Sequence, residues 1–355
     1  MGVLTAYIVK EVLKGSAISL LLLLTLFNLF TFTDQLVFLG KGTYGLKELL
    51  LYLLLTTPRM IYELMPSAAL LGSLFVVGAM ANNREIVAMR AVGLSTFWII
   101  RTIMLAGLFM VITAVLIGEY IAPPSERAAQ VLRTTTQNQG VVLRSQYGMW
   151  LRENNRFINV RKILDDGSLA DVRIYTIDEQ HKLKEITDAE HAKYLGDQQW
   201  QLDGVKQTDV SYEKILSGVL GSRMWQSTID ADLLKVTVVD TDNLSLYDLF
   251  MYIDFLKRNS QKSQVYELAF WSRLINPLVT FVMLMVSAPF AISIGRGTST
   301  GGRIMIGVIV GMTFNIFDKI AGHVGLVYGI NPMLMAVLPS TLMFCGALIA
   351  IRRVS

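Results

Sequence analysis

Six long apolar stretches constrain this chain more than any other feature of its sequence. They cover about 15–40, 60–82, 97–122, 269–294, 303–328 and 332–351. A helix needs about 20 apolar residues to cross the hydrocarbon core of a bilayer, so we predict six membrane-spanning helices. Lys10 and Lys14 precede the first stretch as in a signal peptide, but its apolar part is too long and lacks a small-residue cleavage pattern. We therefore expect it to stay in the membrane.

Charged residues separate the chain into two kinds of segment. Residues 125–265 hold 38 of the 60 charged side chains, which predicts a water-exposed domain between two membrane parts. We expect 1–124 to carry the first three spans and 266–355 the last three. The formal net charge is only +4, and no basic run is interleaved with aromatic residues, so nucleic acid is excluded as an expected partner.

The Lys and Arg residues of the short loops predict that both termini are cytoplasmic, because such loops carry more cations on the cytoplasmic side. With that orientation the cytoplasmic set is Lys10, Lys14, Arg84, Arg90, Arg296, Arg303, Arg352 and Arg353. The outer set is only Lys41, Lys47 and Arg59. Residues 125–265 then lie outside, since a domain of that length translocates regardless of its charge.

The stretch 45–60 is apolar but too short to be a separate span. Pro58 should break a helix here, so we expect an interfacial helix that leads into the second span. One continuous helix over 46–81 is the alternative.

Residues 141–240 alternate with the period of β-strands and are broken by Asp, Gly and Asn. "GMWLRENNRFINVRKI" is typical of a strand, a Glu-Asn-Asn turn and a second strand. We expect roughly eight or nine short strands in an antiparallel sandwich or jelly roll. Residues 243–262 return to helical spacing, with one apolar face formed by Leu246, Leu249, Tyr252, Ile253 and Leu256. The predicted fold class is an α-helical membrane protein with an inserted all-β, jelly-roll-like domain.

Nothing in the sequence predicts catalysis. His181 and His191 have neither metal-ligand spacing nor a nucleophile signature beside them, and no phosphate-binding P-loop occurs. The glycine-rich 294–303 follows a span instead of a strand, so we expect a cytoplasmic turn. Cys345 is the single cysteine, which excludes an internal disulfide. We expect no enzyme activity, no metal and no cofactor.

Residues 80–95, "MANNREIVAMRAVGLS", place charges between the second and third spans. Asn83 is a suitable N-cap for a short helix, Gly93 can end it and Ser95 can cap the next helix. We expect a helix lying flat at the cytoplasmic face, with Ile86 and Met89 on one side and Arg84 and Glu85 reaching a neighbouring protein. A solvated loop that merely follows the cation rule is the alternative.

Ionisable residues also lie in or close to the spans, where they are costly. These residues are Asp34, Glu63, Glu119, Arg273, Asp318 and Lys319. We expect each of them to have either a structural role at the membrane interface or a contact with the polar head of a substrate. Adjacent helical side chains point about 100° apart, so we expect Asp318 and Lys319 each to find a partner on another helix.

The order of several motifs resembles a known family over essentially the whole chain. The motifs are "FTDQL" (32–36), "MPSAALLGSLFVVG" (65–78), "REIVAMRAVGLS" (84–95), "GEYIAP" (118–123), "FWSRLINPL" (270–278) and "LVYGINP" (326–332). With three spans, an external β domain and three more spans, the chain looks like the permeases of the lipopolysaccharide-export ABC transporter of Gram-negative bacteria. This transporter has two related permeases, an F type and a G type, and the first and last motifs look more like the G type.

The resemblance implies an inner-membrane subunit that pairs with an F-type permease on a cytoplasmic ATPase dimer, which binds the ATP. Lipopolysaccharide would enter from the outer leaflet, between first and fifth spans of the two permeases, and pass to a periplasmic jelly-roll bridge protein. The segment at about 83–93 would be the coupling helix that docks on the ATPase, and Glu85 would match its acidic contact residue. Its predicted coupling residues are Arg84, Glu85, Ile86, Met89 and Arg90.

One departure concerns the substrate site. The G-type pattern carries lysines that face the lipid A phosphates at positions held here by Thr31, Val37 and Phe38. Either cations further along the chain take over, or the partner permease holds the head group. The candidate substrate-binding residues are Asp34, Lys41, Lys47, Arg59, Asp318 and Lys319. The rival functions are a mechanotransmission permease and an envelope sensor, neither of which would move lipid.

Overall fold

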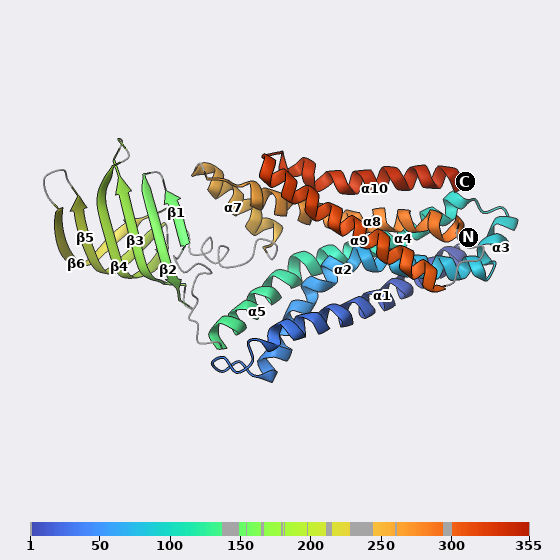
Figure 1. Cartoon of the computed structure of the whole chain (residues 1–355), viewed down its shortest axis with the longest axis horizontal. Coiled ribbons are helices and arrows are strands. Elements are labelled where there is room, and N and C mark those ends of the chain that lie inside the picture. Colours follow the sequence, from blue (N-terminus) through green and yellow to red (C-terminus); the bar gives the residue numbers. More distant parts are fainter. Residues whose placement is uncertain are drawn as a thin grey trace. The chain divides into compact units, whose positions relative to one another are not determined.

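The computed structural model describes residues 2–354 apart from 137–148, 154, 165–166, 179, 181, 197, 211–214, 228–243, 260 and 294–299. The described residues form two compact units (Figure 1). The helical unit contains Met1–Val37, Leu53–Glu126 and Gln264–Ser355. The sheet unit contains Phe38–Tyr52 and Arg127–Ser263. The predicted glycine-rich turn at 294–303 lies largely outside the described residues, and so does His181.

Six helices are long and apolar enough to cross a membrane in the described part of the chain, which confirms the predicted number. The helices outside the sheet are α1 (Gly2–Leu36), α2 (Leu46–Asn82), α3 (Glu85–Ala91), α4 (Thr96–Leu116), α5 (Ala122–Thr136), α7 (Leu246–Arg258), α8 (Gln264–Ser293), α9 (Thr300–Tyr328) and α10 (Pro332–Val354). A short π-helix, η1 (Ile117–Ile121), joins α4 to α5. The first helix therefore begins well before the predicted apolar stretch.

The predicted break at Pro58 is wrong, because α2 runs through both Pro58 and Pro66 without interruption. A proline removes one backbone N–H from the helix, and nearby hydroxyl groups commonly compensate in apolar helices. The hydroxyl of Thr57 donates to the carbonyl of Leu53 at 2.7 Å, one residue before the Leu54 carbonyl that the missing N–H of Pro58 would have reached. The continuous helix, which the sequence analysis kept as the alternative, is the correct description.

The helical unit has two apolar clusters. One joins the first half of α1 to α2, α3 and α4, with Ile8, Val77, Met89 and Ile103 among its buried members. The other joins α2 to α8 and α10 through residues that include Leu70 and Met283. α2 thus contributes to both clusters and forms the centre of the unit.

Among its described residues the sheet unit holds a six-stranded antiparallel sheet in the order β1-β2-β3-β4-β5-β6, where eight or nine short strands were expected. Its strands are β1 (Met149–Glu153), β2 (Arg156–Ile163), β3 (Leu169–Ile177), β4 (Leu183–Gly196), β5 (Gln199–Val210) and β6 (Ile215–Gln226). The predicted β1–β2 hairpin is confirmed by the pairing of Glu153 with Arg156. The strands are longer than expected, with up to 14 residues in β4.

Two residues with left-handed backbone bend the sheet. Asp171 (φ 55°) in β3 and Gly204 (φ 64°) in β5 interrupt the alternation of side chains. Leu202 and Val205, three residues apart, are consequently both buried, although strict alternation would put them on opposite faces. At Gly204 an added Cβ would lie 3.0 Å from the carboxyl group of Glu190, so glycine also gives the space for this side chain.

The predicted helix near 243–262 is confirmed as α7. Ser245 caps its first turn: its hydroxyl accepts from the backbone N–H of Asp248, and its own backbone N–H donates to the Asp248 carboxylate, which completes a capping box. The side chain of Arg127, close to the start of the sheet unit, donates to the Asp248 carboxylate. The buried residues of α7 are Leu249, Tyr252, Ile253, Phe255 and Leu256, close to the predicted face.

Candidate functional site

The helix between the second and third spans starts one residue later than predicted. Asn83 does not cap it, because its backbone N–H still donates to the carbonyl of Ala79 at 2.9 Å and completes α2. The chain instead reverses at Arg84, whose φ of 62° is left-handed, and no side chain caps the first turn of α3. Gly93, with φ 88°, follows the helix, and Ser95 caps α4 as predicted.

The two sides of α3 have different surroundings. Ile86 and Met89 are buried in the apolar cluster of the helical unit, so they hold α3 against its own chain. Arg84 and Arg90 are exposed. Val87, between these arginines, and Val92, which follows Arg90 at the end of α3, expose 62% and 76% of their surface, and sequence reasoning missed both. The free side of α3 is therefore apolar with a cationic border, a composition suited to a protein partner.

Glu85 lies between the buried and exposed sides of α3. Its carboxylate Oε2 accepts a hydrogen bond from the hydroxyl of Tyr7 in α1 at 3.1 Å. Its other oxygen lies 3.5 Å from the amide nitrogen of Asn83. Both donors come from the chain itself, so the orientation of this carboxylate is fixed before any partner approaches.

Two cations meet at the connection between α1 and α2. Lys41 Nζ lies 4.8 Å and Arg133 Cζ 4.3 Å from the ring centroid of Phe38. The loop is fastened to α5, because the Thr43 N–H donates to the Thr136 carbonyl at 2.7 Å. We call Lys41 and Arg133 the Phe38 cation pair. Sequence reasoning missed Arg133 because it lies 92 positions from Lys41 in the sequence.

The Phe38 cation pair carries positive charge at this loop, whereas the neighbouring tyrosine is neutral. Tyr44 is buried in the same unit, and burial raises the pKa of its hydroxyl, with a smaller opposing effect of Arg133. The phenol therefore stays neutral at physiological pH. Lys47, another predicted substrate residue, is exposed on the first turn of α2 and has no ion pair with a described residue.

Arg59 differs from these lysines because carboxylates of its own chain neutralise it. Its Nε lies 2.7 Å from Glu63 Oε1 and its Nη1 lies 3.9 Å from Glu126 Oε1. Glu126 is buried, so the pair ties α2 to α5. Arg59 is consequently a weaker candidate for a phosphate contact than the sequence suggested.

The remaining predicted substrate residues do not form a cluster with these cations. Asp34 is exposed near the end of α1. On α9, Asp318 is half-buried and Lys319 is exposed, and neither forms an ion pair with another helix within the described residues. The predicted interhelical pairs are thus not found in this part of the chain, because α9 has few neighbours: only 17% of its apolar window is buried.

The buried Arg273 and the half-buried Glu119 form an ion pair at the centre of a polar network in the helical unit. Arg273 Nε donates to Glu119 Oε1 at 2.7 Å, and its guanidinium also donates to the Gly118 carbonyl. The Tyr62 hydroxyl donates to the Arg273 carbonyl at 2.7 Å, and the guanidinium lies 5.5 Å from the Tyr62 ring centroid. Because Glu119 lies in η1, this network joins α2, η1 and α8, the structural role proposed for such charges.

The sheet carries polar groups of two kinds. On the side of its buried residues, Arg223 Nη1 lies 2.5 Å from Glu185 Oε1 and 3.3 Å from Gln207 Oε1. Burial opposes ionisation of Glu185, but the hydrogen bonds from Arg223 and Thr187 outweigh it, and the pKa of this carboxyl lies below its usual value. His191, on β4, is exposed, as expected.

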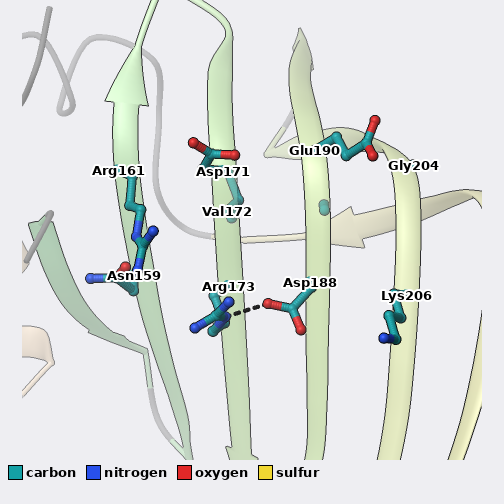
Figure 2. A pocket seen from close by; sticks show the side chains of 10 residues that line it. Asn159, Arg161, Asp171, Val172, Arg173, Asp188, Glu190, Gly204 and Lys206 are labelled. Atoms are coloured by element: carbon teal, nitrogen blue, oxygen red, sulfur yellow. Dashed lines mark hydrogen bonds and ion pairs between the residues drawn. The ribbon is translucent and has the colours of Figure 1, made fainter.

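A polar hollow of about 370 Å³ lies over β2 to β5 (Figure 2). Cations and carboxylates alternate across it, and Arg173 donates to Asp188. That bond raises the pKa of the Arg173 guanidinium, and the ion pair leaves little net charge at this point of the hollow. The hollow offers neither an apolar lining for acyl chains nor an excess of cations for phosphates.

Known proteins match the chain across both units. Residues 6–353 match the model of one family, described as the lipopolysaccharide export system permease LptF/LptG. The chain is 32% identical over 343 residues to the lipopolysaccharide export system permease protein LptG of Haemophilus influenzae, and the match covers 96% of each protein. It is also 32% identical over 356 residues to LptG of Escherichia coli K12, which covers 100% of this chain and 99% of that protein.

Proposed function

Because the chain belongs to the LptF/LptG family of lipopolysaccharide export permeases, we propose that it is the G-type subunit of a heteromeric ABC transporter in the inner membrane. It pairs with an F-type permease and a cytoplasmic ATPase dimer, which binds and hydrolyses the ATP. It extracts lipopolysaccharide from the outer leaflet and delivers it to a periplasmic jelly-roll bridge protein. Both termini are cytoplasmic, and residues 125–265, which hold the sheet, are periplasmic.

The observation that carries this proposal is the exposure of α1 and α9. Only 11% of the apolar window of α1 and 17% of that of α9 are buried in the chain, whereas 67% of that of α2 is buried. Large apolar faces of this kind need lipid or another protein as a neighbour. Lipopolysaccharide enters between first and fifth spans contributed by the two permeases, and α1 and α9 are the first and fifth spans of this chain.

The Phe38 cation pair binds the lipid A phosphates. Phosphates form strong charge-assisted hydrogen bonds with Arg and Lys. Phe38 occupies a position where the G-type pattern has a lysine, yet its ring brings together Lys41 and Arg133 from two segments of the chain. The two cations thus replace the missing lysines close to the end of α1, and Arg59 is not required.

The segment 83–93 couples the permease to ATP hydrolysis. Val87 and Val92 dock into the ATPase, and the carboxylate of Glu85 pairs with one of its cations. Truncating one partner of a charged contact that is partly buried at an interface typically weakens binding by about 2–5 kcal/mol. Ile86 and Met89 serve as the anchor of α3 within the permease.

Reconstitution tests the transport proposal directly. Vesicles that contain both permeases, the ATPase and lipopolysaccharide should release lipopolysaccharide to the bridge protein only with ATP. A photo-crosslinker at Phe30, exposed on α1, should capture lipopolysaccharide far more efficiently than one at Leu342, equally exposed on α10. Equal capture at the two positions would indicate nonspecific lipid contact and contradict entry at α1.

Charge reversal tests the phosphate site. Lys41→Asp and Arg133→Asp should each weaken cross-linking of lipopolysaccharide to α1 more than the control Lys47→Asp, which is exposed but outside the pair. Unchanged cross-linking in both variants would assign the phosphates to the partner permease.

Export is favoured over the two rival functions. A sensor needs an output domain on the cytoplasmic side, whereas the matched family spans residues 6–353 and is described as a lipopolysaccharide export permease. A mechanotransmission permease would drive the sheet unit without moving lipid, so ATP hydrolysis without any release of lipopolysaccharide would favour it.

A further inference from the structure

The first half of α1 is packed against the coupling segment. Ile8 and Val12 of α1 are fully buried in the same apolar cluster as Ile86 and Met89 of α3. Leu4 is partly buried against this cluster. The base of α1 and the helix α3 therefore share one core, and a displacement of α3 acts on α1 by direct contact.

A tight crossing with α2 marks the end of this packed part. Gly15 and Ser16 are buried, and a Cβ added at Gly72 would lie 2.3 Å from the backbone nitrogen of Ser16. Beyond this crossing Leu20 still packs against the cluster, but many apolar side chains of α1, including Ile18, Leu22 and Phe30, are exposed. The helix is thus held at its base and free along the part that borders the proposed lipid entry.

One polar contact crosses from the base of α1 to the first residue of α3. The Tyr7 hydroxyl donates to Glu85 Oε2 at 3.1 Å. A hydrogen bond to an ionised acceptor is stronger than a neutral one, and it limits the rotamers of the glutamate. The bond therefore does two things at once, since it orients the carboxylate and adds a polar link to the apolar contact between the helices.

We propose that Tyr7 is a positioning residue of the transporter: it aims Glu85 at the ATPase and fastens the base of α1 to α3, so that the ATPase stroke reaches the lipid-entry helix directly. This inference rests on the proposed function, because it assumes that α3 is the coupling helix. It adds a residue and a route of transmission that do not follow from docking of α3 alone.

Tyr7→Phe tests the proposal because it removes only the hydroxyl and keeps the ring. In the reconstituted transporter the ATPase should still co-purify with the permeases. The amount of lipopolysaccharide released per ATP hydrolysed should fall about three- to tenfold, the loss expected for one exposed charge-assisted hydrogen bond. Tyr247→Phe is the matched control, since this exposed tyrosine lies on α7, outside α1, α3 and α9. Its yield should equal that of the wild type.

A double-mutant cycle with Glu85→Gln separates positioning from a general loss of stability. If Tyr7 acts through Glu85, the double variant should transport no worse than Glu85→Gln alone. Multiplied losses, or a wild-type yield for Tyr7→Phe beside an impaired Glu85→Gln, would overturn the role of Tyr7 and leave the coupling helix intact. Full transport and undiminished ATPase co-purification in Glu85→Gln would refute the coupling-helix assignment itself.

Discussion

The helices α1 and α2 look alike in the sequence and differ in the structure. They have 35 and 37 residues, and their most apolar windows share a mean hydropathy of 1.9. Yet 11% of this window is buried in α1 and 67% in α2. Hydropathy reports only that a helix prefers an apolar environment, and both lipid and protein supply one. Burial against protein in a membrane instead depends on small residues and on polar contacts between helices.

α2 has both of these features. Gly72 lets the backbone of α1 approach closely, and Ala68 and Ala69 are fully buried. Tyr62 connects α2 to Arg273 of α8. Beyond its packed base, α1 presents large, exposed apolar residues such as Leu22 and Phe30. One helix thus serves as the scaffold, and the other is suited to contact mobile lipid.

The largest expected effect comes from breaking the polar network beside α2. Arg273→Met should remove the ion pair with Glu119 and lower the free energy of unfolding by about 3–5 kcal/mol. Denaturation of the purified protein in detergent measures this change. Arg273→Met combined with Glu119→Gln should recover part of the loss because no buried charge is then left. A single variant as stable as the wild type would show that the network does not hold α2.

Gly72→Ala should have the next largest effect. The added Cβ would meet backbone atoms of Gly15 and Ser16, 2.6 Å or less away, which cannot move independently of α1. Overpacking usually costs about 1–3 kcal/mol, and we expect the upper end of this range. Gly346→Ala in α10 is the control, since a Cβ there meets no atom within 4 Å. Equal thermal stability of the two variants would contradict the tight crossing.

A pair of leucines compares the two helices directly. Leu70 in α2 exposes 1% of its surface and Leu22 in α1 exposes 64%. Leu70→Ala should destabilise the protein by about 1–2 kcal/mol, less than in a soluble core because lipid also solvates leucine. Leu22→Ala should change stability by less than about 0.5 kcal/mol and instead reduce lipopolysaccharide cross-linking to α1. Equal destabilisation by both substitutions would remove the distinction between scaffold and lipid-contacting helix.

Acidification should have the smallest effect on the free energy of unfolding. This effect comes from an ion pair of the sheet and not from the helices. The folded-state pKa of Glu185 is lowered, so its contribution is full above the unfolded-state pKa and is lost as the pH falls through the folded-state pKa. We expect this contribution to stay below about 1 kcal/mol because Arg223 is partly exposed. Denaturation between neutral and acidic pH should therefore show a shallower dependence in Arg223→Gln, and an unchanged slope would exclude the pair as its source.

Local sequence signals predicted much of the fold. Apolar length gave the six spans, and the Ser95 cap, the β1–β2 turn and the amphipathic α7 were each found where the pattern indicated. The errors had non-local or competing causes. At Pro58 the helix continues because the long apolar segments on both sides outweigh the local effect of one proline. At Asn83 the backbone N–H still completes α2, so this residue does not cap α3.

The candidate site was less predictable because its decisive contacts join distant residues. Arg133 meets Lys41 at Phe38, and Glu126 meets Arg59, across intervals that no periodicity links. The bond from Tyr7 to Glu85 spans 78 positions. A sequence shows which side chains carry charge, but which charges neutralise one another depends on the packing of the helices.

The strand order of the sheet has a consequence for biosynthesis. Each strand pairs with the one made immediately before it, so every contact in the sheet closes a short loop and its formation is fast. The sheet can be complete before α8 leaves the ribosome. The helical unit, in contrast, must bring Leu53–Glu126 together with Gln264–Ser355 across the whole inserted segment. A sheet that folds early shortens the flexible chain between these parts and lowers the entropy lost when they join.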